Sequence, residues 1–375
     1  MAATRSKSRA RRDGQVTAKK IEGLVDEIVS SAKARKDPAI DIPLRTLSNA
    51  RFDPKKRIIE MGSAKQERAF FNMSQAKSFM QTVLIASGCK QLIDEDKTVS
   101  IRGLYYRTKH TIRGTNEKTF NDQGESDPII EDVEVALGAL REELHVFAEN
   151  KGSIAGNLTV VSRGDTIDLR RMGAGGMSIP SIVEPDVFEL RKCEADFVLH
   201  VEKGAVWQRF NEDKFWKKNN CILTHGQGQP PRGVRRLLHR LHDELKLPIY
   251  VLMDNDPWGY YIYSVIKQGS INLAFESKRM AVPDAKFIGV RSADFQEFEL
   301  SDDVKIAIDD KDIKRAKQIL SYPWFTGKKD WENEIGLMLR QGFKMEVESL
   351  LTKSISFVTE TYVPQKLKQA KSWLD

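Results

Sequence analysis

The sequence predicts a multidomain α/β protein in which a small helical domain precedes a larger domain built on a parallel sheet. Its 375 residues exceed what one ordinary domain of about 100–200 residues holds, so two domains are expected. Apolar residues recur at helical spacing between residues 76 and 144. From residue 192 onward, short apolar runs alternate with helical segments, which is the pattern of parallel strands joined by crossover helices.

The composition of the chain indicates what kind of partner it binds. The chain has 60 Lys and Arg against 53 Asp and Glu, and basic surface gains affinity for polyanions by displacing counterions from phosphates. Its three cysteines, Cys89, Cys193 and Cys221, lie far apart, which indicates neither a disulfide framework nor a zinc site. No apolar run is long enough to span a bilayer, and the N-terminus lacks a signal-peptide core. We therefore expect a soluble, cytoplasmic protein without a membrane partner.

Residues 1–69 are expected to lie outside both domains. Residues 1–20 carry seven Lys or Arg and one Asp, which is typical of a disordered basic arm, either functional or simply a solvated tail. A helical pattern follows over residues 20–34, with Ile21, Leu24, Val25 and Ile28 on one stripe. With no local core to cover, this stripe could dock on a partner subunit.

Residues 70–161 are expected to form the helical domain. One helix is predicted from residue 76 and a second after Ser100, a good N-cap residue. A third is predicted to open at Asp127-Pro128, with Pro in the first helical position. A charged loop at residues 113–124 and a strand within residues 152–161 complete the pattern. Three helices and a strand pair fit a winged-helix domain.

Residues 162–190 are rich in Gly and Pro and are expected to connect the domains, whereas residues 191–375 should form the parallel-sheet domain. Its strands are predicted at residues 197–201, 221–224, 248–253 and 286–290, and its helices at residues 205–218, 231–245 and 260–267. In such sheets, ligands bind beyond the carboxyl ends of the strands.

Three carboxylates follow the ends of two of these strands. Glu202 follows the first strand, and Asp254 and Asp256 follow the third, so all three should meet at one edge of the sheet. Hard oxygen ligands in this number suit Mg²⁺. Asp-x-Asp followed by Pro and Gly is also common in plain turns, but the additional Glu202 favours a metal site.

A glycine-rich segment, GQGQPPRG, precedes a helix that carries Arg232, Arg235 and Arg236. Backbone amides at a helix N-terminus beside arginines can bind phosphate, so these arginines are candidate DNA contacts. An ordinary tight turn from strand to helix explains the same residues equally well. The chain contains no P-loop motif.

Two adjacent tyrosines, Tyr105 and Tyr106, lie in a basic segment of the helical domain. Neighbours on a helix point about 100° apart, so one ring can pack inward while the other faces solvent. Arg102 lies four residues before Tyr106, on the same face. A tyrosyl oxygen, with a pKa of about 10, becomes a useful nucleophile when cations or a base favour the phenolate. Plain packing is the commoner role of such a pair.

Taken together, the motifs RGLYYRTKH, VEKG, GQGQPPRG and MDNDPWG resemble those of the A subunits of topoisomerase VI, the type IIB DNA topoisomerases. The family is shared with the meiotic double-strand-break transesterase, and the resemblance covers about residues 70–375. It implies a winged-helix domain bearing Tyr106 and a Toprim domain, Rossmann-like in its parallel sheet, bearing Glu202, Asp254 and Asp256. Arg102 matches a functional arginine of the family, and the source implied is archaeal.

The resemblance also implies a mechanism. Tyr106 would attack a DNA phosphorus and form a 5′-phosphotyrosyl link, assisted by Mg²⁺ on the three acids, of which Glu202 also has a catalytic role. Arg107, Lys109 and His110 would contact double-stranded DNA. The chain would form a homodimer in which each tyrosine works with the other protomer's acids. Because the chain has no ATP-binding motif, a separate B subunit of the GHKL ATPase type would complete an A2B2 heterotetramer.

Three alternatives remain open from the sequence. A recombination initiator would use the same chemistry but would not reseal the break. A winged-helix regulator without catalysis would explain the charge and the first domain but not the three acids. A phosphatase of the haloacid-dehalogenase type would use Asp254 as nucleophile, yet its motif falls here on the third strand, and Trp258 stands where Thr or Val is usual.

Overall fold

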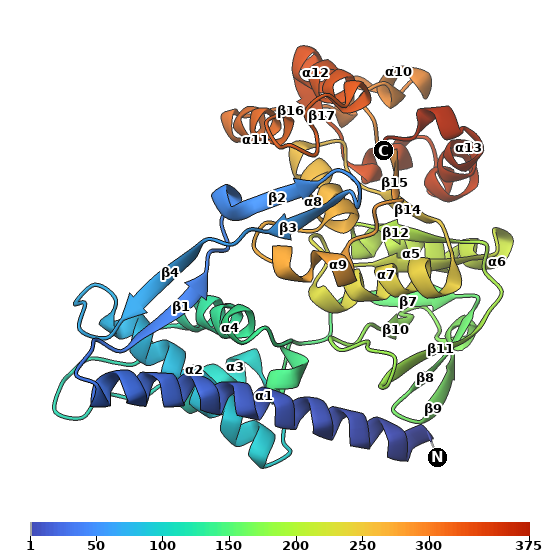
Figure 1. The fold of residues 1–375 in the computed structure, drawn as a ribbon. Coiled ribbons are helices and arrows are strands. Elements are labelled where there is room, and N and C mark those ends of the chain that lie inside the picture. Colours follow the sequence, from blue (N-terminus) through green and yellow to red (C-terminus); the bar gives the residue numbers. More distant parts are fainter. Residues whose placement is uncertain (1) are drawn as a thin grey trace. The chain divides into compact units, whose positions relative to one another are not determined.

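A computed structural model describes residues 2–375, with side chains from residue 14 onward. The chain divides into two compact units (Figure 1). Unit 1 comprises Met1–Asn49 and Met61–Glu149, and unit 2 comprises Ala50–Glu60 and Asn150–Asp375. Along the described chain, no helix is both long and apolar enough to cross a membrane.

Unit 1 opens with one long helix, α1 (Ala2–Lys33), where a disordered arm followed by a short helix was expected. The second expectation for this segment, an apolar stripe without a core to cover, is also wrong. Ile21 is 2% exposed and belongs to the core of unit 1, and Leu24 and Ile28 pack on its margins. Only Val25 of the stripe stays exposed. The helix is therefore held by its own unit.

Three further helices build the rest of the unit 1 core: α2 (Ala76–Asp94), α3 (Ile101–Thr108) and α4 (Gln123–Leu137). Ser100 caps α3 as expected, because its hydroxyl accepts a hydrogen bond from the amide of Gly103. Helix α4 starts earlier than predicted: Asp122 is its cap, and Pro128 lies inside the helix, within the first two turns.

The sequence analysis did not predict the short strands of unit 1. β1 (Ala39–Pro43) pairs antiparallel with β4 (Lys65–Ala69), and β5 (Val99–Ser100) pairs parallel with β6 (Val146–Phe147). The 3-10 turns η1 (Leu47–Asn49) and η2 (Glu142–Leu144) complete the unit. Ile40 and Ile42 of β1 are buried in a small satellite cluster together with Phe79 of α2, so this ribbon is anchored to the helices.

Unit 2 is built on a six-stranded sheet with the order β10-β7-β13-β12-β14-β15. Its four parallel strands are β12 (Phe197–Val201), β13 (Cys221–His225), β14 (Ile249–Leu252) and β15 (Lys286–Gly289), each within two residues of its predicted bounds. Between them lie α5 (Gly204–Glu212), α6 (Phe215–Lys218), α7 (Arg232–Leu245) and α8 (Pro257–Gln268). The predicted alternation and parallel sheet are confirmed (Figure 1).

Residues 152–190 differ from their prediction. β7 (Ser153–Gly156), expected in the winged-helix domain, pairs antiparallel with β13 and extends the unit 2 sheet, and β10 (Met177–Ser178) pairs with β7. β8 (Leu158–Ser162), β9 (Asp165–Asp168) and β11 (Phe188–Cys193) form a three-stranded sheet beside η3 (Leu169–Arg171). The expected linker is thus a folded part of unit 2. Its glycines serve strand ends and turns.

A hairpin, a further strand pair and several helices complete unit 2. A hairpin of β2 (Ala50–Asp53) and β3 (Ile58–Met61) precedes the sheet in sequence, and β16 (Ile306–Ala307) pairs with β17 (Phe343–Lys344). The helical elements after α8 are η4 (Ala274–Glu276), α9 (Ser277–Met280), α10 (Asp294–Glu297), η5 (Asp302–Val304), α11 (Asp310–Leu320), α12 (Lys329–Gln341), η6 (Val347–Thr352), the π-helical η7 (Val358–Tyr362), α13 (Val363–Lys368) and η8 (Ala370–Ser372).

The burial of α1 makes a testable prediction about stability. Ile21→Ala should lower the free energy of unfolding of unit 1 by about 2–4 kcal/mol, because it leaves a cavity in the core. Val25→Ala, on the same helix but 41% exposed, should change it by less than about 1 kcal/mol. Urea unfolding followed by circular dichroism measures both. Equal effects of the two substitutions would mean that α1 does not pack on unit 1.

Candidate active site

The adjacent tyrosines of α3 take opposite environments. Tyr105 is 6% exposed and lies in the unit 1 core, whereas Tyr106 is 59% exposed. Burial of Leu104 and Tyr105 fixes the rotation of the helix and turns Tyr106 outward. The Arg102 guanidinium lies 6.0 Å from the centre of the Tyr106 ring, on the same exposed face. The predicted inward and outward assignment of the two rings is confirmed, and Tyr106 has a cation beside it.

The basic residues after Tyr106 differ in how strongly they are bound to other residues of unit 1. Arg107 and His110 are exposed, and Arg107 makes only a loose ion pair with Glu95, at 3.6 Å. Lys109 donates a hydrogen bond to the Tyr105 hydroxyl, and this bond raises the pKa of the lysine. Lys109 therefore also braces the buried ring, while Arg107 and His110 are available to a ligand.

In unit 2, the three predicted acids follow the ends of adjacent parallel strands. Glu202 follows β12, and Asp254 and Asp256 follow β14, which pairs with β12. One oxygen of Glu202 accepts a hydrogen bond from the Asp254 amide, at 3.4 Å. Asp256 caps α8, because its Oδ1 accepts from the amide of Gly259.

The acids are close enough to disturb one another's ionisation. Burial, followed by repulsion from Asp254 and Asp256, raises the pKa of Glu202 to about 7. Burial raises the pKa of Asp254 to about 6, although hydrogen bonds from Lys203 and from the Val347 amide oppose it. Burial also raises the pKa of Asp256. Ionisation of these carboxyl groups therefore costs free energy in the folded chain.

A segment far along the chain closes over Asp254. Asn255 and Met345 form an antiparallel bridge in which each backbone amide donates to the other residue's carbonyl oxygen, at 2.8 and 3.2 Å. This bridge brings the Val347 amide to 2.8 Å from Asp254 Oδ1. The other oxygen, Oδ2, lies 2.8 Å from the ammonium of Lys203. Both oxygens of Asp254 thus have partners within unit 2.

The three acids meet at one edge of the sheet, as expected, but they are not arranged as a ready ligand set. Among the described residues, no three Asp, Glu, His or Cys side chains are grouped closely enough to hold a metal ion. The reason is local: Asp256 turns to its helix cap, and Asp254 to Val347 and Lys203. The donors still fit a divalent cation, since they are all carboxylates, and a cation would offset the burial and the repulsion that raise the pKa of Glu202 and Asp254.

The three arginines predicted to contact DNA after the glycine-rich segment have internal roles instead. Arg235 is 2% exposed, and burial lowers the pKa of its guanidinium to about 10. Arg236 donates two hydrogen bonds to Glu184, and Arg232 lies 2.7 Å from Glu276. We therefore correct this expectation: Arg232 and Arg236 pair with acids of unit 2, and Arg235 is buried with its Nε and Nη2 atoms lacking hydrogen-bond partners in the described part of the chain. The loop itself does lie beside the acids, because the amide of Gly228 donates to the carbonyl oxygen of Glu202.

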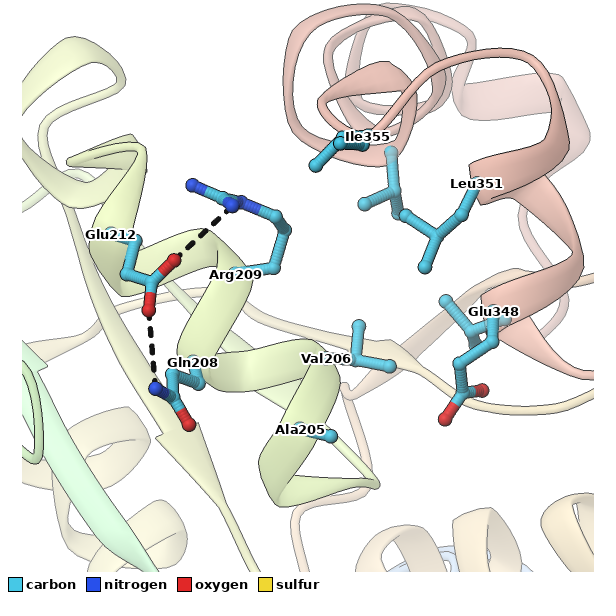
Figure 2. Close-up of a pocket in the computed structure, with 10 residues that line it drawn as sticks. Ala205, Val206, Gln208, Arg209, Glu212, Glu348, Leu351 and Ile355 are labelled. Carbon is cyan, nitrogen blue, oxygen red and sulfur yellow. Dashed lines mark hydrogen bonds and ion pairs between the residues drawn. The ribbon is translucent and has the colours of Figure 1, made fainter.

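A cavity of about 270 Å³ lies between α5 and the segment from Val347 to Val358 (Figure 2). Its lining is mainly apolar and includes Val206, Leu351 and Ile355. Glu348 also lines it, and Figure 2 shows its carboxylate projecting into the space in front of α5. The same carboxylate lies 2.9 Å from Lys203, so the cavity borders the surroundings of the acids.

Lys203, Glu346 and Glu348 were missed as candidates by the sequence analysis. Lys203 directly follows Glu202, and its position inside the VEKG motif could have drawn attention to it. Glu346 and Glu348 alternate in the same manner as Asp254 and Asp256. Their proximity to the acids, however, depends on the bridge between Asn255 and Met345, which no local pattern predicts.

Comparison with known proteins agrees with this division of the chain. Residues 197–367 match the family model for the Toprim domain shared by Spo11 and the topoisomerase 6 A subunit, and residues 77–146 match the model described as "Type IIB DNA topoisomerase". The chain is 43% identical over 368 residues to the A subunit of type 2 DNA topoisomerase 6 from Pyrococcus horikoshii, covering 96% of each chain. The protein of the same name from Aeropyrum pernix is 41% identical over 380 residues, covering 97% of this chain and 96% of the relative. The A3 subunit of DNA topoisomerase 6 from rice is 33% identical, covering 97% and 80%.

The raised pKa of Glu202 predicts a stability that depends on pH. Because the pKa rises on folding, from 4.5 to about 7, ionised Glu202 opposes folding. This cost is absent below pH about 4.5, grows between these two values and is complete above pH about 7. With a chelator present, Glu202→Gln should therefore raise the melting temperature at pH 8, corresponding to a gain on the order of 2 kcal/mol, and should leave it unchanged near pH 4.5.

Differential scanning calorimetry with EDTA measures this difference. Glu189→Gln, at a position where the carboxylate is 46% exposed on β11, is the control and should behave as wild type at both pH values. If Glu202→Gln changed the melting temperature by the same amount at both pH values, ionisation of the Glu202 carboxyl group would not oppose folding.

Proposed function

Because the chain belongs to the family of type 2 DNA topoisomerase 6 A subunits, we propose that it cleaves and reseals double-stranded DNA through Tyr106. One observation carries this assignment of the nucleophile. Of the two adjacent tyrosines in the unit matched as type IIB topoisomerase, only Tyr106 is exposed, and it has the Arg102 guanidinium beside its ring. The relatives' names favour cutting followed by resealing over cutting alone.

The reaction is a transesterification. The Tyr106 oxygen attacks a backbone phosphorus, an O–P bond forms, and the bond from phosphorus to the 3′ oxygen breaks, leaving a 5′-phosphotyrosyl ester. Arg102 is placed to stabilise negative charge on the phenolate oxygen or on the attacked phosphate. Because one ester replaces another, the energy of the broken bond is kept, and the 3′ hydroxyl can attack the phosphotyrosine to reseal the strand.

Glu202, Asp254 and Asp256 are proposed to hold Mg²⁺. A bound Mg²⁺ ion would offset charge on the phosphate and on the leaving 3′ oxygen. The support is the position of these acids at the ends of adjacent strands in the segment matched as a Toprim domain, and their mutual repulsion. Glu202, the carboxylate with the highest of the stated pKa values, is also suited to hold or release a proton near neutral pH.

Unit 1 is proposed to be the winged-helix, DNA-binding part of the chain, and unit 2 the Toprim part. Within unit 1, the DNA surface would include Arg107 and His110 around Tyr106, with Lys109 contributing charge although it braces Tyr105. Arg232, Arg235 and Arg236 are not part of this proposed surface, because they pair internally or are buried.

The proposed assembly is an A2B2 heterotetramer. The relatives are named as A subunits, which implies a second kind of subunit. The chain has no P-loop motif, so the resemblance to topoisomerase VI supports a B subunit of the GHKL ATPase type as the source of ATP hydrolysis. Two copies of this chain would supply two tyrosines, one for each DNA strand.

Tyr106→Phe tests the nucleophile. It should reduce the covalent protein–DNA adduct to background in the presence of Mg²⁺ and the ATPase subunit, because the attacking oxygen is gone, while DNA affinity stays within about twofold. Tyr105→Phe is the matched control: it loses a buried hydroxyl that bonds Lys109, worth about 1 kcal/mol of stability, but should still form the adduct. Adduct is measured by denaturing gel after trapping. Loss of adduct in Tyr105→Phe alone would reverse the assignment.

A mixed dimer tests whether the active site is shared. Family resemblance supports pairing each tyrosine with the acids of the other protomer. A purified heterodimer of one Tyr106→Phe chain and one Asp254→Ala chain would then keep one intact site and should nick a single strand, whereas each mutant homodimer should cut nothing. Supercoiled plasmid converted to the open circular form reports nicking. An inert heterodimer, alongside an active wild-type dimer, would mean that Tyr106 works with the acids of its own chain.

A further inference from the structure

Lys203 joins the candidate metal ligands to a second pair of acids. Its ammonium lies 2.8 Å from Asp254, 2.9 Å from Glu348 and 3.4 Å from Glu346. All four residues belong to unit 2, and the three carboxylates come from two segments that the bridge between Asn255 and Met345 holds side by side. The single positive charge of Lys203 is therefore shared between Asp254, the inner acid, and Glu346 and Glu348, the outer pair.

At the inner acid, Lys203 lies against an oxygen that a metal ion could ligate. Asp254 Oδ1 accepts a hydrogen bond from the Val347 amide, and Oδ2 lies 2.8 Å from the Lys203 ammonium, so a metal ion that ligates Oδ2 would share this oxygen with Lys203. A divalent ion and an ammonium group a few ångströms apart repel each other strongly where water is scarce, and Asp254 is 5% exposed. A cation that ligates Asp254 through Oδ2 therefore competes with Lys203.

The outer pair offers Lys203 somewhere to go. The side chains of Glu346 and Glu348 are 52% and 34% exposed, against 6% for Asp254, and Glu348 borders the cavity in front of α5 (Figure 2). Lysine carries its charge on a flexible four-carbon stem, so the ammonium can shift toward water and keep its contact with Glu348. The backbone bridge stays in place during such a shift, because only the side chain moves.

We propose that Lys203 is a displaceable internal counter-ion that holds Asp254 while no metal is bound and withdraws to Glu346 and Glu348 when a divalent cation binds. The inference rests on the proposed metal site. Lys203 is thus a positioning residue. Its charge offsets the charge of the acids while the site is empty, and its displacement sets the affinity of the site for a divalent cation. Glu348 acts on metal affinity through Lys203 rather than through direct contact.

Metal affinity without DNA tests this role, with Mn²⁺ alone as the probe in isothermal titration calorimetry of the full chain. Lys203→Met should lower the Kd about three- to tenfold, because the competitor is gone, and should lower the melting temperature of the metal-free chain. Glu348→Gln should raise the Kd several-fold, because Lys203 loses its outer partner. In the Lys203→Met background, Glu348→Gln should have little effect, so the two changes are non-additive.

The exposed pair Lys218 and Glu360 supplies matched controls, since Lys218→Met and Glu360→Gln remove the same charges where the two side chains, 3.4 Å apart, are 58% and 60% exposed. Neither should alter Mn²⁺ affinity by more than about twofold, as expected for screened surface charges. Lys203→Gln replaces Lys203→Met in the cycle if the methionine variant does not fold.

The outcomes separate the inference from the proposed site. If the effects of the Lys203 and Glu348 substitutions on Mn²⁺ affinity were additive, the counter-ion role would be wrong. If Asp256→Asn still abolished Mn²⁺ binding in that case, the metal site itself would be supported. Absence of Mn²⁺ binding to the wild-type chain, or binding unchanged by Asp256→Asn, would overturn the site and the inference together.

Discussion

The parallel sheet of unit 2 brings carboxylates to one edge, where burial and mutual repulsion make their ionisation costly. Adjacent strands β12 and β14 end side by side, and each is followed by acids. The surrounding structure compensates in three ways. Asp256 accepts a hydrogen bond from the amide of Gly259 as the cap of α8, Asp254 accepts one from the amide of Val347, and the Lys203 ammonium offsets the charge of Asp254. Even so, the pKa of Glu202 rises to about 7, so the compensation is incomplete.

This incompleteness matters for function. An acid cluster that is fully satisfied by its own chain would have little affinity for a cation, whereas an uncompensated one would oppose folding. Here the compensating groups are a helix terminus, one backbone amide and a mobile side chain. The first two can remain when a cation arrives, and the third can leave. In the proposed site, the same carboxylates would therefore serve both a stable fold and reversible binding of an ion.

Much of this arrangement could be predicted from the sequence. The strands of the parallel sheet follow from short apolar runs separated by helical periodicity, and their carboxyl ends locate Glu202, Asp254 and Asp256. The opposite environments of Tyr105 and Tyr106 follow from the 100° step of a helix, together with one cation four residues away. These features depend on local periodicity and on topology rules, which a single sequence carries.

The remainder depends on contacts between distant segments. Residues 162–190 look like a linker because Gly and Pro are frequent, yet their short strands pair with β7 and β8 and fold into unit 2. Arg235 and Arg236 look like phosphate ligands until tertiary structure buries one and brings Glu184 to the other. Residues 345–348 come to lie over Asp254 only through the bridge with Asn255. Partners of this kind have no periodic signature.

The phase of α3 limits how this protein can change in length. Ser100 fixes where the helix begins, and burial of Leu104 and Tyr105 fixes its rotation, so Tyr106 faces outward by counting residues from the cap. One residue inserted or deleted between Ser100 and Leu104 would turn the following side chains by about 100° relative to that cap. The loop after Ile112 carries exposed residues, and its ends are tied together by the bridge between Thr111 and Lys118. Natural variation in length should therefore accumulate in the loop and be excluded from the first turn of α3.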